Sequence, residues 1–261
     1  MKIAAGIDIG SLSTDAVLFS EKRIISSCVV PTGANVEEAA LSAYEQVLKQ
    51  AGLKKEDINI VISTGYGRNS ISFTNKAITE ITCHAVGARF LFNDVRTVID
   101  IGGQDSKVIK LSLEGRVEDF AMNDKCAAGT GRFLEVMARS LGTNVQEMGQ
   151  LSLESKSDIK VSSTCTVFAE SEVVALVAGG ASKQDIINGL HNAVSERIIG
   201  MVKRLCALPT FVFTGGVAKN IGVAKAVEAG LGYKIYIPSD PQIVGALGAA
   251  ITGLHRLDGG L

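Results

Sequence analysis

Short apolar runs alternate with longer amphipathic stretches along the chain, a pattern typical of an α/β protein. The first part of the chain reads as three strands, a helix, a strand and a second helix. The strands are expected over residues 2–9, 16–19, 23–30 and 58–63, and the helices over 36–51 and 80–92. Asn35 and Gly52 fit the two ends of the longer helix, because Asn caps helix N-termini and Gly favours the left-handed position at the C-terminus.

The same order of elements then begins again and continues through the rest of the chain. Three strands are followed by helices, and two further strands lie between the later helices. The strands are expected over residues 97–101, 107–113, 116–121, 210–214 and 234–237, and the helices over 131–141, 183–205, 218–229 and 244–257. Ser182 is expected to cap the longest of these helices, with Asp185 at its third position.

The restart is an internal repeat. The segment that begins at Asp8, D-I-G-S-L-S-T, aligns without gaps on the segment that begins at Asp100, D-I-G-G-Q-D-S. Both consist of a strand, an acid, a glycine, a small polar turn and a second strand. The repeat predicts two similar α/β domains that face each other across a cleft. We expect residues 1–95 to form the first domain, 96–238 the second, and 239–261 a C-terminal helix that packs back on the first.

Each D-I-G turn has chemistry that suits a nucleotide. A glycine lets backbone N–H groups approach phosphate oxygens, and the acid beside it can hold a hydrated Mg²⁺. A third segment, 213–220 (F-T-G-G-V-A-K-N), leads from a strand through two glycines into a helix, which suits a nucleoside. The candidate Mg²⁺ residues are Asp8 and Asp100. The candidate nucleotide residues are Gly10, Ser11, Leu12, Ser13, Thr14, Gly102, Gly103, Gln104, Gly215, Gly216 and Lys219.

Together these segments resemble the actin, sugar-kinase and heat-shock ATPase superfamily. Residues 6–19 resemble its first phosphate loop, 100–109 its second, 213–220 its adenosine motif and 245–250 its small-residue hinge helix. The resemblance implies two ribonuclease-H-like (actin-like ATPase) domains facing a cleft that binds ATP or ADP with Mg²⁺. Rival nucleotide folds fit less well, because the chain has no G-x-x-x-x-G-K-[ST] motif and no G-x-G-x-x-G after a predicted strand.

The chain has five cysteines, an odd number with no C-x-x-C pair, which argues against a disulfide framework. Cys126 and Cys165 each come immediately before a segment that reads as a helix, and a helix N-terminus lowers a thiol pKa and stabilises anions. Two thiolates cannot complete an iron–sulfur site that needs four, but a symmetric dimer can bring two from each chain to its axis. Cys28, Cys83 and Cys206 are expected to be structural.

The segments N-D-K-C-A-A-G-T-G-R-F-L around Cys126 and S-S-T-C-T-V-F-A-E-S-E around Cys165 closely resemble the ATP-dependent activators of (R)-2-hydroxyacyl-CoA dehydratases. A more distant resemblance is to the ATPase subunits of benzoyl-CoA reductases. The resemblance covers essentially the whole chain. It implies a homodimer with one 4Fe–4S cluster held by both cysteines of each subunit. It also implies a flavodoxin or ferredoxin donor and ATP-dependent transfer of one electron to the dehydratase. In this interpretation Gln104 orients the attacking water.

The first phosphate loop departs from the family pattern at two positions. The family commonly has a lysine where this chain has Asp15 and a threonine where it has Leu12, whereas the aligned residue of the second loop is Lys107. Loss of a cation near the phosphates would weaken nucleotide binding or slow hydrolysis, or would mark a relative with a different client. Three alternatives stay open: a small-molecule kinase of the same superfamily, an activator of another radical enzyme such as a benzoyl-CoA-reductase-like partner, and a nucleotide-gated scaffold.

Composition adds mainly exclusions. The chain has 261 residues, of which 46% are hydrophobic and 20% charged, and its net charge is −1. This balance allows a packed core and gives no sign of a nucleic-acid or membrane-surface partner. Asp8 interrupts the N-terminal apolar run too early for a signal peptide, and no apolar stretch reaches the roughly 20 residues of a membrane helix, so we expect a cytoplasmic protein. His84 is expected to be structural, and residues 65–68 a structured turn.

Overall fold

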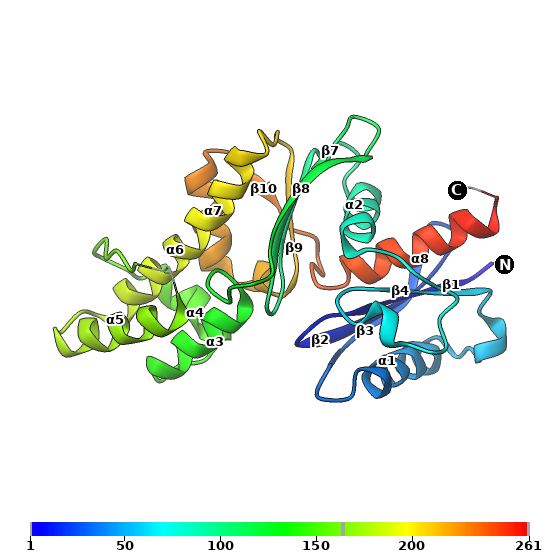
Figure 1. The fold of residues 1–261 in the computed structure, drawn as a ribbon, viewed down its shortest axis with the longest axis horizontal. Helices are drawn as coiled ribbons and strands as arrows, with labels where there is room; N and C mark the ends of the chain where they lie inside the picture. The colour runs from blue at the N-terminus through cyan, green and yellow to red at the C-terminus, as the bar shows by residue number, and fades with distance from the viewer. Residues whose placement is uncertain (1, 163–164, 260–261) are drawn as a thin grey trace. The chain divides into compact units, whose positions relative to one another are not determined.

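The computed structural model describes residues 2–162 and 165–259, so Ser163 and Thr164 of the motif around Cys165 lie outside the described residues. The chain divides into two compact units (Figure 1). The first unit comprises Met1–Val95, Leu111–Glu118 and Pro238–Leu261, and the second comprises Arg96–Lys110 and Asp119–Ile237. Each unit therefore has its own sheet and its own core.

The first unit is built on a five-stranded sheet in the order β3-β2-β1-β4-β5. Strands β1, β2 and β3 are antiparallel neighbours, whereas β4 pairs parallel to β1 and β5 parallel to β4. The strands are β1 (Ala4–Ile9), β2 (Ser13–Ser20), β3 (Arg23–Pro31), β4 (Ile60–Thr64) and β5 (Lys76–Ala77). Helix α1 (Val36–Ala51) covers one face, and α2 (Glu80–Leu91) and α8 (Val244–Leu257) cover the other (Figure 1).

Strand β1 is buried on both faces, and its side chains alternate between the two helical layers. Its odd-numbered residues from position 5 onward pack in the core under α1, whereas Ala4 packs in the core under α8. Gly6 lies so close to α8 that a Cβ there would overlap the carbonyl oxygen of Ala246. The alternation places Asp8, near the end of the strand, on the α8 side.

The second unit repeats this topology. Its sheet has the order β10-β9-β6-β7-β8. Read from the other end, β8-β7-β6-β9-β10, this is the order of the first sheet with β1 to β5 replaced by β6 to β10. Strand β6 pairs antiparallel to β7 and parallel to β9, and β10 pairs parallel to β9. The strands are β6 (Thr97–Ile101), β7 (Ser106–Leu111), β8 (Val117–Asn123), β9 (Phe211–Thr214) and β10 (Ile235–Tyr236). The expected fold class, two similar α/β domains, is confirmed.

The second unit differs from the first in the helices between its third and fourth strands. Where the first unit has α1, the described part of the second has a group of helices that leads from β8 to β9. These are α3 (Gly131–Ser140), α4 (Val145–Ser152), α5 (Thr166–Ala178) and α6 (Lys183–Arg204), and α7 (Ile221–Leu231) follows β9. Both Cys126 and Cys165 lie in this segment between β8 and β9. None of the helices in the described ranges is long and apolar enough to cross a membrane.

Most predicted elements begin and end within two residues of the observed ones. The helix expected over 218–229 begins instead at Ile221. Gly216–Lys219 forms a separate 3₁₀ turn, and the side chain of Asn220 caps α7 by accepting from two backbone N–H groups at 3.0 and 3.1 Å. Helix α4 and strand β5 were not predicted, because both are too short to show a clear hydrophobic period.

The predicted ends of the longest helices are confirmed. Asn35 Oδ1 accepts from the N–H of Glu38 at 3.2 Å at the start of α1, and Gly52 ends that helix with a φ of +66°. At the start of α6, the hydroxyl of Ser182 accepts from the N–H of Asp185 at 3.1 Å. These local contacts explain why the helix boundaries could be predicted from short sequence motifs.

His191 is a fully buried histidine of α6 that lies beside the cap of α7. Its Nε2 is 3.4 Å from Nδ2 of Asn220, and its Nδ1 has no hydrogen-bond partner among the residues that the structure describes. Burial lowers the pKa of His191 to about 4. The cause is the low polarity of the core, which disfavours the charged imidazolium. The folded protein therefore holds this side chain neutral at any pH well above 4.

We expect the free energy of unfolding to fall as the pH drops from about 6.5 to about 4. In this window the unfolded chain binds a proton at His191 and the folded chain does not, so acid favours unfolding. The contribution of His191 to the free energy of unfolding is present in full above pH ~6.5. It amounts to roughly 3 kcal/mol, because the pKa of the side chain is about 6.5 in the unfolded chain and about 4 in the folded protein. Urea unfolding at a series of pH values measures it.

His191→Gln should lose this part of the pH dependence. His255→Gln is the matched control, because it makes the same change at an exposed position near the end of α8. Equal slopes of stability against pH in His191→Gln and the wild type would contradict the assignment.

Candidate nucleotide site and cysteine loops

The turn between β1 and β2 holds the first set of predicted nucleotide residues. The N–H of Gly10 closes the turn by donating to the carbonyl oxygen of Ser13 at 2.9 Å. Thr32, which is buried, supports the turn twice. Its hydroxyl donates to the carbonyl oxygen of Gly10 at 2.8 Å, and its N–H donates to that of Leu12 at 3.0 Å. The predicted residues Gly10, Ser11, Leu12 and Ser13 are half-buried in this turn, and Thr14 is buried.

Asp8 lies at the end of β1, buried to 8% exposure. Asp15 of β2 is directly opposite it, so both side chains lie on the same face of the sheet. Nε2 of His84 in α2 is 3.8 Å from Asp8 Oδ2, and Gly245 of α8 is so close that a Cβ there would overlap the same oxygen. Two neighbouring carboxylates offer the hard oxygen ligands that Mg²⁺ prefers.

Asp100 occupies the equivalent place at the end of β6, but it faces a lysine. Nζ of Lys107 lies 3.2 Å from Oδ2 of Asp100 and 2.8 Å from Oδ2 of Asp105. Lys107 is buried, and the two carboxylates compensate its charge. The N–H of Gly102 donates to the carbonyl oxygen of Asp105 at 3.0 Å, which closes this turn as the first turn is closed. Gln104 is exposed at the tip.

Thr214 and Gly215 complete the surroundings of Asp100 from the neighbouring strand. The hydroxyl of Thr214 donates to Oδ1 of Asp100 at 3.1 Å. Gly215 has a φ of +85°, and a Cβ there would lie 2.7 Å from the same Oδ1. Backbone conformation and space therefore both require glycine at this position. Beyond it, Gly216 and Lys219 are exposed on the 3₁₀ turn.

The first unit has a matching glycine turn beside Asp8, which the sequence reasoning did not assign to the site. Thr64 pairs with Asp8 across β1 and β4, and Gly65 follows with a φ of +85°, the value found at Gly215. A Cβ at Gly65 would overlap Oδ1 of Asp8. A sequence signal was present, because a strand ending in T-G occurs in both halves of the chain at the equivalent place.

Arg68 fixes the glycine turn of the first unit. Its Nη1 donates to the carbonyl oxygen of Gly65 and to Oε2 of Glu80, both at 2.9 Å. The N–H of Gly67 donates to the carbonyl oxygen of Ile9 at 3.0 Å. The structured turn expected over residues 65–68 is therefore confirmed, and it is joined directly to the end of β1.

Cys126 does not lie immediately before a helix, so this expectation was wrong. Helix α3 begins five residues later at Gly131, with Thr130 as its N-cap. The loop between turns back at Gly129, whose φ is +84°. Asn123 holds it, because its side-chain Nδ2 donates to the carbonyl oxygen of Cys126 at 2.8 Å. The dipole of α3 therefore does not act on Cys126 through direct capping.

Cys165 is the N-cap residue of α5, as expected. The loop that leads to it is anchored at two points. Asp185 accepts from two backbone N–H groups of this loop at 2.7 and 2.9 Å, and Glu172 accepts from the N–H and the hydroxyl of Ser162 at 2.8 and 2.9 Å. Hydrogen bonds from the Ser182 hydroxyl and from the loop hold the pKa of Asp185 well below its usual range.

The helices that follow the two cysteine loops pack against each other. The hydroxyl of Ser140 at the end of α3 donates to Oε1 of Glu170 in α5 at 3.0 Å. Cys126 and Cys165 are both half-buried. Within the described ranges, no group of three or more His, Cys, Asp or Glu side chains is placed to hold a metal ion.

The other cysteines lie elsewhere. Cys28 and Cys83 are buried in the first unit, where the thiol of Cys28 donates to the carbonyl oxygen of Ala43 at 3.3 Å. Burial raises the pKa of both thiols, that of Cys83 to about 12. Both side chains therefore stay as neutral thiols. Cys206 is exposed just after α6.

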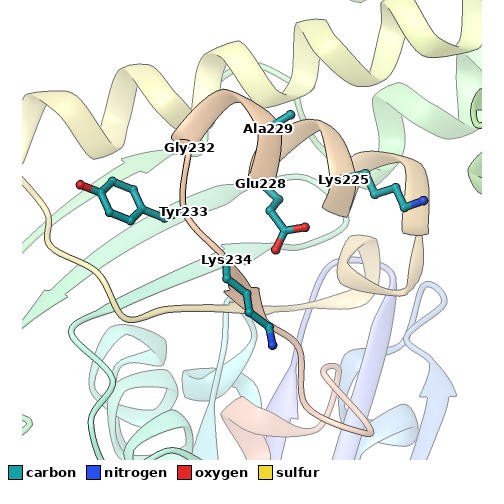
Figure 2. A pocket seen from close by; sticks show the side chains of 6 residues that line it. All are labelled: Lys225, Glu228, Ala229, Gly232, Tyr233 and Lys234. Atoms are coloured by element: carbon teal, nitrogen blue, oxygen red, sulfur yellow. The ribbon is translucent and has the colours of Figure 1, made fainter.

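A pocket of about 640 Å³ lies at the C-terminal end of α7, and none of the predicted site residues lines it (Figure 2). Its lining residues are Lys225, Glu228, Ala229, Gly232, Tyr233 and Lys234. Figure 2 shows that Tyr233 and Lys225 point in opposite directions, so the side chains do not converge. Glu228 is already used to accept from the N–H of Ile235 at 3.1 Å. This pocket is not the candidate nucleotide site.

A sequence profile of the BadF/BadG/BcrA/BcrD ATPase family matches residues 5–253. The match includes both D-I-G turns and both cysteine loops. The chain belongs to this ATPase family. Nucleotide binding and ATPase activity, expected from the paired D-I-G turns, are thereby confirmed at the level of the family.

Three relatives show how close the similarity is. The activator of lactoyl-CoA dehydratase from Anaerotignum propionicum is 47% identical over 247 residues, which is 94% of this chain and 95% of the relative. The activator of the 2-hydroxyisocaproyl-CoA dehydratase from Clostridium difficile, solved with bound ADPNP, has a TM-score of 0.94 at 41% identity, covering 98% of this chain and 96% of that one. Component A of the Acidaminococcus fermentans (R)-2-hydroxyglutaryl-CoA dehydratase has a TM-score of 0.95 at 43% identity, covering 99% and 100%. The resemblance to dehydratase activators and the actin-like ATPase fold are both confirmed.

Replacing Gly65 by Ala should displace the carboxylate of Asp8 as well as strain the backbone. Gly33→Ala is the matched control, because Gly33 also has a positive φ, +60°, but a Cβ there would meet nothing within 4 Å. The control should lose about 1–2 kcal/mol of unfolding free energy, the cost of a left-handed residue with a side chain. Gly65→Ala should lose more, and it alone should weaken Mg·ATP binding. Urea unfolding and calorimetric titration measure the two effects, and equal effects of the two variants would contradict the assignment.

Proposed function

We propose that the chain is an ATP-dependent activator of a 2-hydroxyacyl-CoA dehydratase, to which it passes one electron from a 4Fe–4S cluster shared by two copies of the chain. One observation carries this proposal: Cys126 and Cys165 lie half-buried on two loops of one unit, each leading into one of a pair of packed helices. The same chain is 41% and 43% identical to two activators of such dehydratases over almost its full length.

In this proposal the D-I-G turn of each unit supplies groups that bind nucleotide phosphates. Backbone N–H groups of the turns that begin at Gly10 and Gly102 take phosphate oxygens. Asp8 and Asp100 hold Mg²⁺ through water, which suits buried carboxylates at the ends of strands. Gln104, exposed at the tip of the second turn, orients the attacking water. The residues assigned to phosphates are Gly10, Ser11, Leu12, Ser13, Thr14, Gly102 and Gly103, and those assigned to the nucleoside are Gly215, Gly216 and Lys219.

The cysteines fit half of a cluster site. When bound, the cluster would supply a single low-potential electron. Cys126 and Cys165 provide two thiolates, and the described part of the chain has no larger group of metal-binding side chains. A second copy of the chain would complete the four thiolates.

An exposed apolar surface beside Cys165 supports a dimer. Val167, Phe168 and Val174 of α5 are 67%, 69% and 58% exposed. Contiguous apolar side chains on a surface are typical of interaction sites. Because the surface starts two residues after Cys165, a second copy that shares the cluster would cover its first turn.

The remaining partners follow from the same proposal. A flavodoxin or ferredoxin would supply the electron, and the dehydratase would receive it. A shift of 100 mV in a one-electron potential corresponds to about 2.3 kcal/mol. Coupling between two binding sites is typically about 1–3 kcal/mol, so nucleotide binding is sufficient to change electron transfer.

Asp8→Ala and Asp100→Ala should each weaken Mg·ATP binding by about tenfold or more, roughly 1.4 kcal/mol. The reason is the loss of the carboxylate that holds the hydrated cation. Gln104→Ala should keep ATP affinity but lose most of its turnover, because it contacts only the attacking water. Asp119→Ala, at an exposed position of β8, is the control and should behave like the wild type. Calorimetry and phosphate release measure the effects; wild-type affinity in both aspartate variants would refute the assignment.

Anaerobically purified protein should contain about four iron atoms per two chains, the content of one Cys₄-bound 4Fe–4S cluster per dimer. Cys126→Ser and Cys165→Ser should each lose the cluster, whereas Cys206→Ser, the exposed control, should keep it. Air should bleach the visible absorption. Iron and sulfide analysis with the visible spectrum decides the matter, and four irons on a monomer would rule out the shared site.

A further inference from the structure

Helix α3 begins directly against the second phosphate turn. The N–H of Gly131 donates to the carbonyl oxygen of Gly102 at 2.9 Å, and the N–H of Arg132 donates to that of Gly103 at 2.8 Å. The first N–H groups of a helix need partners outside the helix, usually a capping side chain. The N-cap residue Thr130 makes no such side-chain bond. The phosphate turn itself therefore caps α3.

Gly131 lies where three segments meet. A Cβ at this position would be 3.1 Å from the carbonyl oxygen of Gly102, 3.4 Å from Cα of Gly103 and 3.6 Å from Cγ2 of Val217. Val217 belongs to the 3₁₀ turn after β9, the segment assigned to the nucleoside. The start of α3 thus contacts both segments of the second unit that are assigned to the nucleotide, and a Cβ at Gly131 would be crowded by the carbonyl oxygen of Gly102.

The loop that carries Cys126 is built on the same helix start. The N–H and the hydroxyl of Thr130 donate to the carbonyl oxygen of Ala127 at 3.0 and 2.6 Å. Asn123 Nδ2 donates to the carbonyl oxygen of Cys126 at 2.8 Å. Ala128 and Thr130 are fully buried. The Thr130 bonds therefore tie the loop to the helix start, and the Asn123 bond ties Cys126 to the end of β8, so a displacement of the helix start is transmitted to the Cys126 loop.

We propose that the backbone N–H groups of Gly131 and Arg132 couple the nucleotide at the second phosphate turn to the position of the Cys126 loop. This rests on the proposed function, which assigns phosphate to Gly102 and Gly103. Phosphate oxygens accept from the N–H side of the turn, while its carbonyl side accepts from α3. A change of nucleotide that rotates these peptide groups therefore moves the helix start and the Cys126 loop together. Because coupling of binding free energies is reciprocal, whatever binds at Cys126 changes nucleotide affinity by the same factor.

Hydrogen–deuterium exchange in the apoprotein, with thiols reduced, tests the coupling without cluster or client. The probes are Mg·ADP and Mg with a non-hydrolysable ATP analogue, and the readout is exchange of the amides at positions 123–130. In the wild type the two nucleotides should give exchange rates that differ by about fivefold or more, the lower end of typical coupling. Calorimetry on the same samples shows separately whether nucleotide binds.

Gly131→Pro is the decisive variant. Proline is well tolerated at the first position of a helix, and Thr130 before it is extended, with a φ of −126° and a ψ of 174°. The substitution keeps α3, removes the N–H that donates to Gly102 and places the ring Cδ against that carbonyl oxygen, so this contact cannot form. Gly131→Ala keeps the N–H and crowds the carbonyl oxygen instead. Gly200→Ala in α6 is the control, because a Cβ there would meet nothing within 4 Å.

Both Gly131 variants should still bind nucleotide, yet the nucleotide-dependent difference at positions 123–130 should fall below about twofold, out of the usual range of coupling. Gly200→Ala should keep the wild-type difference. The coupling is overturned if Gly131→Pro keeps the full difference in exchange between the two nucleotides, or if a wild type that binds nucleotide shows no difference. Either result leaves the proposed function unaffected. A wild type that binds no nucleotide would overturn the proposed function as well.

Discussion

A carboxylate is buried at the end of β1 and of β6, and the chain around each is shaped by the need to surround a buried charge. A carboxylate in a protein interior needs close polar partners, so the neighbouring backbone must approach it closely. Gly65 and Gly245 do so at Asp8, and Gly215 does so at Asp100, each at a position where a Cβ would crowd a carboxylate oxygen. The glycines therefore shape the surroundings of both carboxylates although they have no side chains.

The two copies of this arrangement differ in the charge that faces the carboxylate. Asp100 shares the buried ammonium of Lys107 with Asp105, so this turn carries its own cation. Asp8 instead faces Asp15 across the strands. Two carboxylates side by side repel each other, and a divalent cation relieves that repulsion. The difference between Asp15 and Lys107 thus changes the charge that faces the buried aspartate, whereas the backbone of the first turn is closed in the same way as that of the second.

Much of the fold could be predicted because its signals are local. The two D-I-G turns revealed the repeat, and capping residues such as Asn35 and Ser182 fixed helix ends within a few positions. The start of α3 was predicted correctly at Gly131, but the groups that cap it were not, because they belong to the turn at Gly102 and Gly103, which is distant in sequence. Gly65 was missed although a strand ending in T-G occurs in both halves, because its importance comes from its closeness to the carboxylate of Asp8 on another strand. The roles of the site residues in catalysis and cluster binding stay predictions.

Helix α8 has a consequence for the order in which the protein forms during synthesis. Ala246, Leu247 and Ile251 share one core with Ala4 and Val17, from opposite ends of the chain. The N-terminal sheet leaves the ribosome first, but the face that α2 and α8 share is only partly covered until α8 has been made. The second unit, Arg96–Lys110 with Asp119–Ile237, is synthesised entirely within that interval and can finish folding first. The nascent chain therefore exposes part of one apolar sheet face for most of translation, when that face is open to association with other chains.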